Sequence, residues 1–214
     1  MTLMNRRTLI ASLALLPAAL LPLQARAALT LTDRDRADIA RIEAYLSGLR
    51  SLKARFLQVA PNGSTSDGVV WLERPGRMRF QYDPPSPFLL VANYGLVVFH
   101  DSKLEQTSTV PLSQTPLGII LADQVKLSGD VEIVGLRRLP DEIELTLQRT
   151  ASPSDGTITL YFSDQKLALQ RWTVVDQQRQ ETSVRLFNVE LGGKFDAALF
   201  KVTVPSQLPT GGGG

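Results

Sequence analysis

The side chains that most often perform catalysis are scarce in this sequence. Among 214 residues there is one histidine, His100, and no cysteine. A nucleophile–base pair or a metal site requires several such groups to converge on one point. His100 stands at the end of an expected strand, next to Asp101 and a turn, and this position is typical of a solvated structural histidine. We therefore predict no catalytic residue and no metal site.

Acidic side chains gather at Asp141, Glu142 and Glu144, beside a turn and on the polar face of an expected strand. This placement is typical of solubility and of edge protection in a sheet. No P-loop, dinucleotide fingerprint or calcium loop is present, so we expect no cofactor. A Ser-His-Asp arrangement is arithmetically possible because serines are plentiful, which leaves an enzyme as an alternative function.

The first 27 residues have the pattern of a cleaved export signal. Arg6 and Arg7 precede an uncharged run from Thr8 to Gln24, and Ala25-Arg26-Ala27 supplies a small-x-small cleavage site. The run contains two prolines and is short for a spanning helix of about 20 residues, so a signal peptide over 1–27 is favoured over a membrane anchor. The paired arginines fit both the general and the twin-arginine export route.

Cleavage changes the charge of the chain. Loss of Arg6, Arg7 and Arg26 takes the formal net charge from +2 to −1, since no acidic residue precedes Asp33. Nothing in this balance indicates a nucleic-acid partner. Without cysteine, the exported protein has no disulfides and no lipidated cysteine of its own. The remaining 187 residues are long enough to bury a substantial core.

A helix and a long series of strands are expected after the signal. Thr32 and Asp35 fit a capping box, and apolar residues at helical spacing predict one amphipathic helix that ends near Gly48. From Leu52 onward the period changes to two and turn residues recur, which predicts an antiparallel meander. The expected strands are 52–59, 68–74, 77–83, 88–92, 96–100, 105–109, 131–137, 142–148, 157–163, 167–175 and 182–191.

The segment Pro111 to Asp123 interrupts the strands. Thr115 before Pro116 resembles an N-cap followed by proline at the first helical position, with Leu117, Ile120 and Leu121 as the apolar edge of a short helix. Two helices cannot cover both faces of eleven strands, so the sheet must curl. The predicted fold is mainly β with an α lid: a curved antiparallel incomplete β-barrel of about eleven strands, covered by helices.

Large apolar residues occupy the inward positions of these strands. Alternation places the following residues on one face: Met78, Phe80, Tyr82, Val97, Phe99, Ile143, Leu145, Leu147, Ile158, Leu160 and Phe162. A packed core and an apolar cavity both fit this pattern, because periodicity does not distinguish a filled interior from a hollow one. Whether the cavity is open or filled stays undecided at this point.

Several ordered motifs resemble one family. The stretch RPGRMRF from Arg74 to Phe80, followed by Tyr82 and Pro85, resembles the RPGRFRW-x-Y-x-x-P signature of the LolA family, the periplasmic carriers of outer-membrane lipoproteins. Further resemblances follow in order over residues 32–205: the leucine-spaced helix running into F-x-Q at Phe56 and Gln58, a TP-x-x-LL lid segment, and a closing LF-x-F-x-x-P. The family pattern is broken at Asn93-Tyr94-Gly95, Met78, Phe80 and Gly118, and these departures bear on ligand preference and lid stability more than on the fold.

The resemblance implies a lidded, unclosed barrel that receives acyl chains. Arg74 would be the latch, donating to lid backbone carbonyls in the closed state, whereas Arg77 and Arg79 would lie outside. The implied lid residues are Thr115, Pro116, Leu117, Ile120 and Leu121. The implied acyl-chain cavity residues are Met78, Phe80, Tyr82, Val97, Phe99, Leu145, Leu160 and Phe162.

The resemblance also implies a place and partners. The chain would work in the periplasm as a monomer, with a carrier domain over 28–205 and a flexible tail over 206–214. Lipidated lipoproteins would be received from an inner-membrane releasing transporter like LolCDE and delivered to an acceptor like LolB or to the outer membrane directly. The alternatives are a same-fold lipoprotein-binding regulator, like the RseB amino-terminal domain, and an enzyme like VioE.

Overall fold

The computed structural model describes residues 30–202, so the predicted signal peptide and the predicted tail lie outside the described residues. The first element is α1 (Asp33–Gly48). The Thr32 side chain accepts from the Asp35 backbone N–H, and the Asp35 carboxylate accepts from the Thr32 backbone, so the predicted capping box is present. Among residues 30–202, no helix is long and apolar enough to cross a membrane.

Eleven strands form one sheet in which each strand pairs antiparallel with its neighbours. The strands are β1 (Ser51–Val59), β2 (Thr65–Glu73), β3 (Arg77–Tyr82), β4 (Phe88–Asn93), β5 (Leu96–Asp101), β6 (Gln106–Pro111), β7 (Val131–Leu139), β8 (Glu142–Arg149), β9 (Thr157–Ser163), β10 (Ala168–Val175) and β11 (Glu181–Leu191). Their order is β6-β5-β4-β3-β2-β1-β11-β10-β9-β8-β7. The predicted open antiparallel sheet is confirmed.

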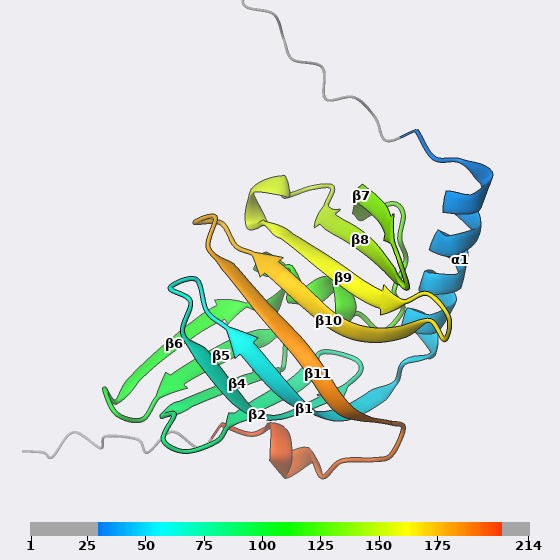
Figure 1. Ribbon diagram of the computed structural model, residues 1–214. Coiled ribbons are helices and arrows are strands. Elements are labelled where there is room, and N and C mark those ends of the chain that lie inside the picture. The colour runs from blue at the N-terminus through cyan, green and yellow to red at the C-terminus, as the bar shows by residue number, and fades with distance from the viewer. Residues whose placement is uncertain (1–29, 203–214) are drawn as a thin grey trace, which may run out of the picture.

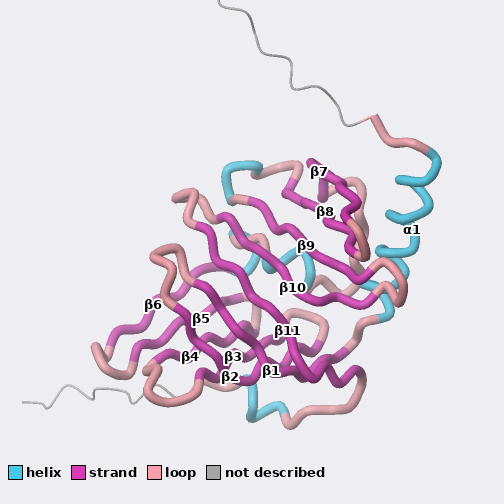
Figure 2. Tube along the Cα trace, in the orientation of Figure 1, coloured by secondary structure: helices cyan, strands magenta, loops and turns pink. Residues whose placement is uncertain are grey.

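The sheet curls strongly but has two edges, β6 and β7 (Figure 1). Pairing of β1 with β11 brings the first and last strands together in the middle of the sheet. The short helices between β6 and β7 lie behind β9 and β10 in Figure 2. Their buried residues belong to the same apolar cluster as the inward strand residues, so they lie on the concave side.

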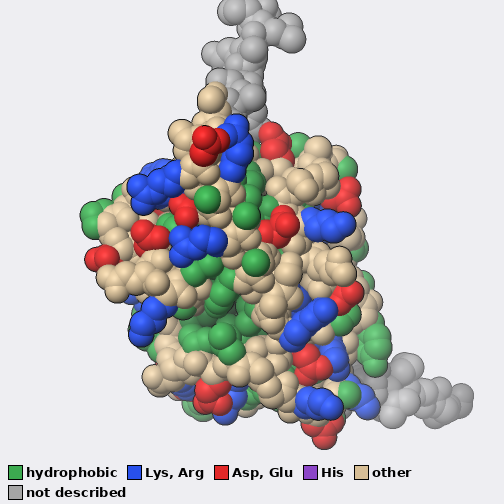
Figure 3. Space-filling view, turned by 90° about the vertical axis from the view of Figure 1, so that its right-hand side faces the viewer, with side chains coloured by type: hydrophobic (Ala, Val, Ile, Leu, Met, Phe, Trp, Pro, Cys, Tyr) green, Lys and Arg blue, Asp and Glu red, His purple; other side chains and the backbone are tan. Residues whose placement is uncertain are grey.

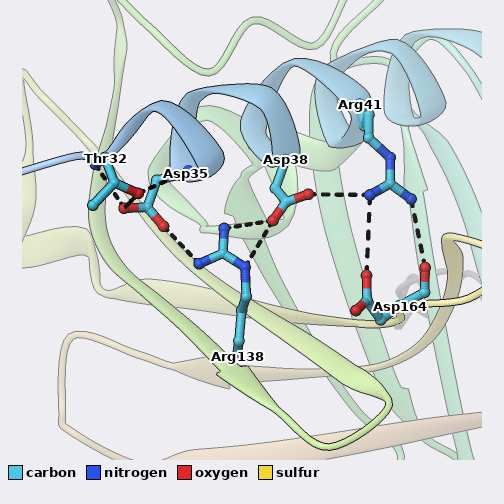
Figure 4. A network of polar contacts seen from close by, with 6 residues as sticks. All are labelled: Thr32, Asp35, Asp38, Arg41, Arg138 and Asp164. Atoms are coloured by element: carbon cyan, nitrogen blue, oxygen red, sulfur yellow. Dashed lines mark hydrogen bonds and ion pairs between the residues drawn. The ribbon is translucent and has the colours of Figure 1, made fainter.

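Polar bonds fasten α1 to the sheet (Figure 4). Arg138 on β7 donates to Asp35 and to Asp38, and Arg41 bridges Asp38 to Asp164 in the turn between β9 and β10. Farther along the helix, Ile42 and Leu46 are fully buried. The N-terminal half of α1 is therefore held by ion pairs and its C-terminal half by apolar packing.

The segment after β6 forms two short helical pieces, η1 (Leu112–Gln114) and α2 (Leu117–Ile120). The predicted short helix is present, but the N-cap role predicted for Thr115 is wrong. The Thr115 hydroxyl donates to the Leu112 carbonyl at 2.9 Å, and its backbone N–H donates to the same oxygen at 3.1 Å. Thr115 therefore closes the preceding 3-10 turn, because that nearby carbonyl captures its hydroxyl.

The C-terminal segment covers part of the outer face. Its short helix η3 (Ala197–Phe200) packs on β3 and β4, and Phe200 is buried there. Arg77 pairs with Glu73 and lies over the Phe200 ring at 5.4 Å, while Arg79 donates to the Leu199 carbonyl at 3.0 Å. Both arginines thus lie on the outer face, as expected, but η3 covers them. A further 3-10 turn, η2 (Pro153–Asp155), precedes β9.

Candidate functional site

The inward residues predicted to line a cavity pack closely against one another. Met78, Phe80, Tyr82, Leu145, Leu160 and Phe162 are all buried and belong to one apolar cluster. Aromatic rings pack edge to face within it, with Phe56 to Phe80 centroids at 4.8 Å and Phe80 to Trp172 centroids at 6.2 Å. In this conformation these six positions form a packed core, and their role as acyl-chain contacts stays a prediction.

Tyr82 carries a polar group into this core. Its hydroxyl donates to the Gln58 side-chain oxygen at 2.9 Å. Burial raises the pKa of Tyr82 to about 12, although the bond to Gln58 acts in the opposite direction. The phenol is therefore neutral at physiological pH.

An apolar cleft of about 440 Å³ opens beside the lid. Val97 and Phe99, the other two predicted cavity residues, line it on the sheet side, and Thr115, Pro116 and Leu117 line it on the lid side. Further apolar lining comes from Leu90, Val110 and Val174, and polar lining from Ser108, Gln114, Asp155, Asp176, Gln177 and Gln178. The predicted lid and two predicted cavity residues therefore meet at one opening.

Backbone hydrogen bonds hold the lid at both ends. The Leu112 N–H donates to the Gly95 carbonyl at 2.8 Å, and the Gly76 N–H donates to the Leu121 carbonyl at 2.8 Å. Ile119, Ile120 and Leu121 are buried between these ends. Opening the lid would break both bonds and expose all three side chains.

The segment after the lid is tied to α1. Ser47 donates to the Val125 carbonyl at 3.1 Å, and the Leu127 N–H donates to the Glu43 carboxylate at 2.8 Å. These two bonds attach the chain that follows the lid to the C-terminal half of α1.

Arg74 is 5 % exposed and lies two residues before Gly76, whose N–H bonds to the end of the lid. The hydrogen bonds to lid carbonyls implied by the resemblance are absent, because none of its three guanidinium nitrogens has an acceptor among the described residues. Arg50 donates to the carbonyl and carboxylate of Asp123, and the Leu121 carbonyl accepts from Gly76. Burial, followed by the charge of Arg50, lowers the pKa of Arg74 to about 10.

A second arginine lies against the lid, and our interpretation of the sequence did not single it out. A Cβ atom on Gly118 in α2 would stand 2.4 Å from Nη2 of Arg149, the last residue of β8. The Arg149 Nε is buried and has no acceptor among the described residues. The signal that could have found it is alternation, because Arg149 follows Ile143, Leu145 and Leu147 at inward spacing.

His100 lies away from the cleft lining. Its Nδ1 is 3.0 Å from the Thr107 hydroxyl across β5 and β6, and His100 is half-buried. Among residues 30–202, no group of three or more His, Cys, Asp or Glu side chains could hold a metal ion.

Other hollows occur elsewhere on the surface. One of about 500 Å³ lies against Tyr94, Leu96 and Val202, on the outer side of β4 and β5. Another of about 320 Å³ lies at the C-terminal end of α1, between Tyr45 and Leu191. On the face that carries α1, hydrophobic side chains gather in a hollow bordered by charged groups (Figure 3). The hollows of about 500 and 320 Å³ include none of the predicted lid or cavity residues.

Residues 47–203 match the family model described as outer membrane lipoprotein carrier protein LolA. Relatives with the name outer-membrane lipoprotein carrier protein occur in Azotobacter vinelandii, at 28 % identity over 83 % of this chain and 89 % of the relative. Those of Dechloromonas aromatica and Pseudomonas aeruginosa are also 28 % identical, over 88 % and 80 % of this chain and 89 % and 86 % of the relatives.

Solved structures of low sequence identity are also similar. A putative outer-membrane lipoprotein-sorting protein domain from Vibrio parahaemolyticus superposes with a TM-score of 0.47, at 8 % identity, over 76 % of this chain and 94 % of that one. A LolA superfamily protein from Nitrosomonas europaea gives 0.42, at 10 % identity, over 77 % and 97 %. At these values the superpositions carry no functional information.

Proposed function

This chain belongs to the LolA family, and we propose that it carries lipoproteins through the periplasm by sheltering their acyl chains in the curled sheet. The observation that carries the proposal is the family match over 47–203, together with the apolar cleft where Val97, Phe99 and Leu117 meet. The sheltering step is hydrophobic burial and requires no catalytic group.

Cargo entry requires the lid to move. Ligand pockets for drug-sized molecules usually measure about 300–1,000 Å³, and the cleft of about 440 Å³ is small for a multiply acylated cargo. The neighbouring inward positions are filled by their own side chains. We infer that acyl chains enter at Val97 and Phe99 and extend inward as Ile119, Ile120 and Leu121 withdraw.

The energy of lid closure explains how a carrier can release its cargo. Three chains of roughly sixteen carbons would gain about 0.8 kcal/mol for each buried methylene, or about 35–40 kcal/mol in full burial. Non-covalent affinities saturate near about 18–21 kcal/mol. The work of displacing the lid and its packed residues subtracts from the affinity, so that cargo can be handed over.

Transfer between membranes completes the proposal. Cargo would be loaded from an inner-membrane releasing transporter like LolCDE and delivered to a lipidated acceptor like LolB or to the outer membrane directly. In this proposal Arg74 acts as the latch that favours closure.

The proposal is tested by identifying what the protein holds in cells. The protein is purified from the cell envelope and its bound molecules are identified by mass spectrometry, with Phe99→Asp as the variant and Leu104→Asp as its control. Phe99 lines the cleft, whereas Leu104 is 61 % exposed at a turn. Lipidated proteins should accompany the wild type and Leu104→Asp but not Phe99→Asp. Recovery of small polar metabolites alone would refute the carrier function and favour an enzyme.

A further inference from the structure

Two inward rows of apolar residues end in an arginine next to the lid. On β8, Ile143, Leu145 and Leu147 are fully buried, and Arg149 is the next residue on that face. On β2, Val70 and Leu72 are buried, and Arg74 follows at the same spacing. Four strands separate β2 from β8 in the sheet. The apolar interior is therefore bounded by a guanidinium at two separate places along the lid.

Arg149 lies against the backbone of α2. A Cβ atom on Gly118 would be 2.4 Å from its Nη2 and 2.6 Å from the Leu112 carbonyl oxygen. Any residue other than glycine would push the guanidinium away or strain the turn. Gly118, which departs from the family pattern, therefore provides the space in which Arg149 contacts the lid.

The guanidinium of Arg149 is short of acceptors in this closed arrangement. Its Nε is buried without a hydrogen-bond acceptor among the described residues, and none of the ion pairs found there includes it. Five buried side-chain polar atoms lack a partner among the described residues: three belong to Arg74, one is the Nε of the half-buried Arg149, and one is the Ser86 hydroxyl. A buried donor without an acceptor is costly, so an arriving acceptor would be bound favourably.

The position of Arg149 fits the polar head of the cargo. Leu117, adjacent to Gly118, lines the cleft, and so does Asp155 in the turn that follows β8. Chains lying along the inward row of β8 would place their linkage to the glycerol at the end of that row. An acyl ester is neutral and offers a carbonyl acceptor, which a guanidinium binds through a charge-assisted hydrogen bond.

We propose that Arg149 binds the ester carbonyl oxygens of the lipid head of the cargo, with Gly118 providing the space for it. The inference rests on the proposed carrier function and adds a recognition residue to it. Arg149 distinguishes an acyl ester from an apolar chain of equal length, and it donates to the cargo once α2 moves aside.

The test is a competition between two lipopeptides that differ only in the linkage. One carries two palmitoyl chains as esters on a glyceryl-cysteine, and the other carries hexadecyl ethers, which lack the carbonyl oxygens. Both are offered at equal concentration to the protein lacking residues 1–27, and the bound ratio is read by native mass spectrometry. We expect the wild type to favour the ester about tenfold, the lower end of what a hydrogen bond to a charged group contributes, and Arg149→Leu to bring the ratio close to one.

The control variant is Arg137→Leu, because Arg137 pairs with Glu144 on the outside and is 69 % exposed. It should keep the wild-type ratio. A wild-type ratio near one would refute the assignment without any variant. An unchanged ratio in Arg149→Leu would refute the assignment of Arg149 as the ester-binding residue. If hydrogen exchange over 117–121 also became faster, the role of Arg149 would be to support the lid. If the wild type bound neither lipopeptide, the carrier function itself would fail.

Discussion

Two guanidinium nitrogens of Arg138 on β7 donate hydrogen bonds to the carboxylate of Asp38 on α1. Its Nε lies 2.8 Å from the Asp38 Oδ2, and its Nη2 donates to the same oxygen, while its Nη1 reaches Asp35 at 2.7 Å (Figure 4). The Asp38 side chain is 8 % exposed. Because Ser47 and Glu43 of α1 also bond to Val125 and Leu127, this pair anchors the helix that holds the segment after the lid.

Asp38→Asn should weaken this anchor. The amide keeps the size of the side chain but removes the charge that Arg138 and Arg41 share, and a hydrogen bond to a charged group contributes about 2 kcal/mol. We expect the free energy of unfolding to fall by about that amount in urea titrations. Asp33→Asn is the control, since Asp33 is fully exposed and pairs only with Arg36 among the described residues. Equal stability of the two variants would contradict the anchoring role.

Asp35 predicts an acid-dependent loss of stability. The Thr32 hydroxyl and backbone N–H, and then Arg138, lower the pKa of Asp35 to about 2. Because the folded-state pKa lies below the unfolded value of about 3.9, the ionised carboxylate stabilises the fold above that value. This contribution disappears as the pH falls from about 4 to 2. The difference in unfolding free energy between wild type and Asp35→Asn should therefore shrink over that range, and a constant difference would count against the lowered pKa.

Leu145→Ala tests whether the interior is filled. Leu145 is fully buried among its neighbours, and removing such a side chain from a packed core costs about 2–5 kcal/mol. If Leu145 lined an empty cavity, its truncation would lower the free energy of unfolding by less, because fewer atoms would contact the side chain. We expect the larger loss in chemical denaturation. Leu104→Ala, at an exposed turn, should change stability by less than about 0.5 kcal/mol.

The sequence could predict the strands because their alternation is local. Arg77 to Tyr82 alternates polar and apolar residues, and the same residues form β3 with Met78, Phe80 and Tyr82 inward. The same information could not decide whether the interior is filled. Periodicity assigns a residue to a face, whereas packing depends on residues brought to that face from distant strands, as Trp172 is brought to Phe80.

Competing contacts, one local and the others between distant segments, account for what the sequence did not reveal. Thr115 looked like an N-cap, but a carbonyl three residues earlier captures its hydroxyl. The pattern places Arg77 and Arg79 on the outer face, but it does not show that η3 covers them. Leu199 of η3, which bonds to Arg79, is 120 residues away in the sequence. From the sequence, Gly118 indicates a weaker lid helix. Its proximity to Arg149, a residue of a distant strand, is visible only in the folded chain.

Arg74→Leu tests the latch. The resemblance implies that the guanidinium favours the closed lid, so the variant should load lipoprotein normally and release it poorly to an acceptor. The structure supplies a competing expectation, because a buried guanidinium without an acceptor destabilises the closed state, and leucine would relieve that cost. We expect the first result, measured as transfer of a lipidated protein to outer-membrane vesicles. Normal release, together with slower hydrogen exchange over 117–121, would instead show that Arg74 opposes closure, and the latch would have to be assigned to the Gly76–Leu121 backbone bond.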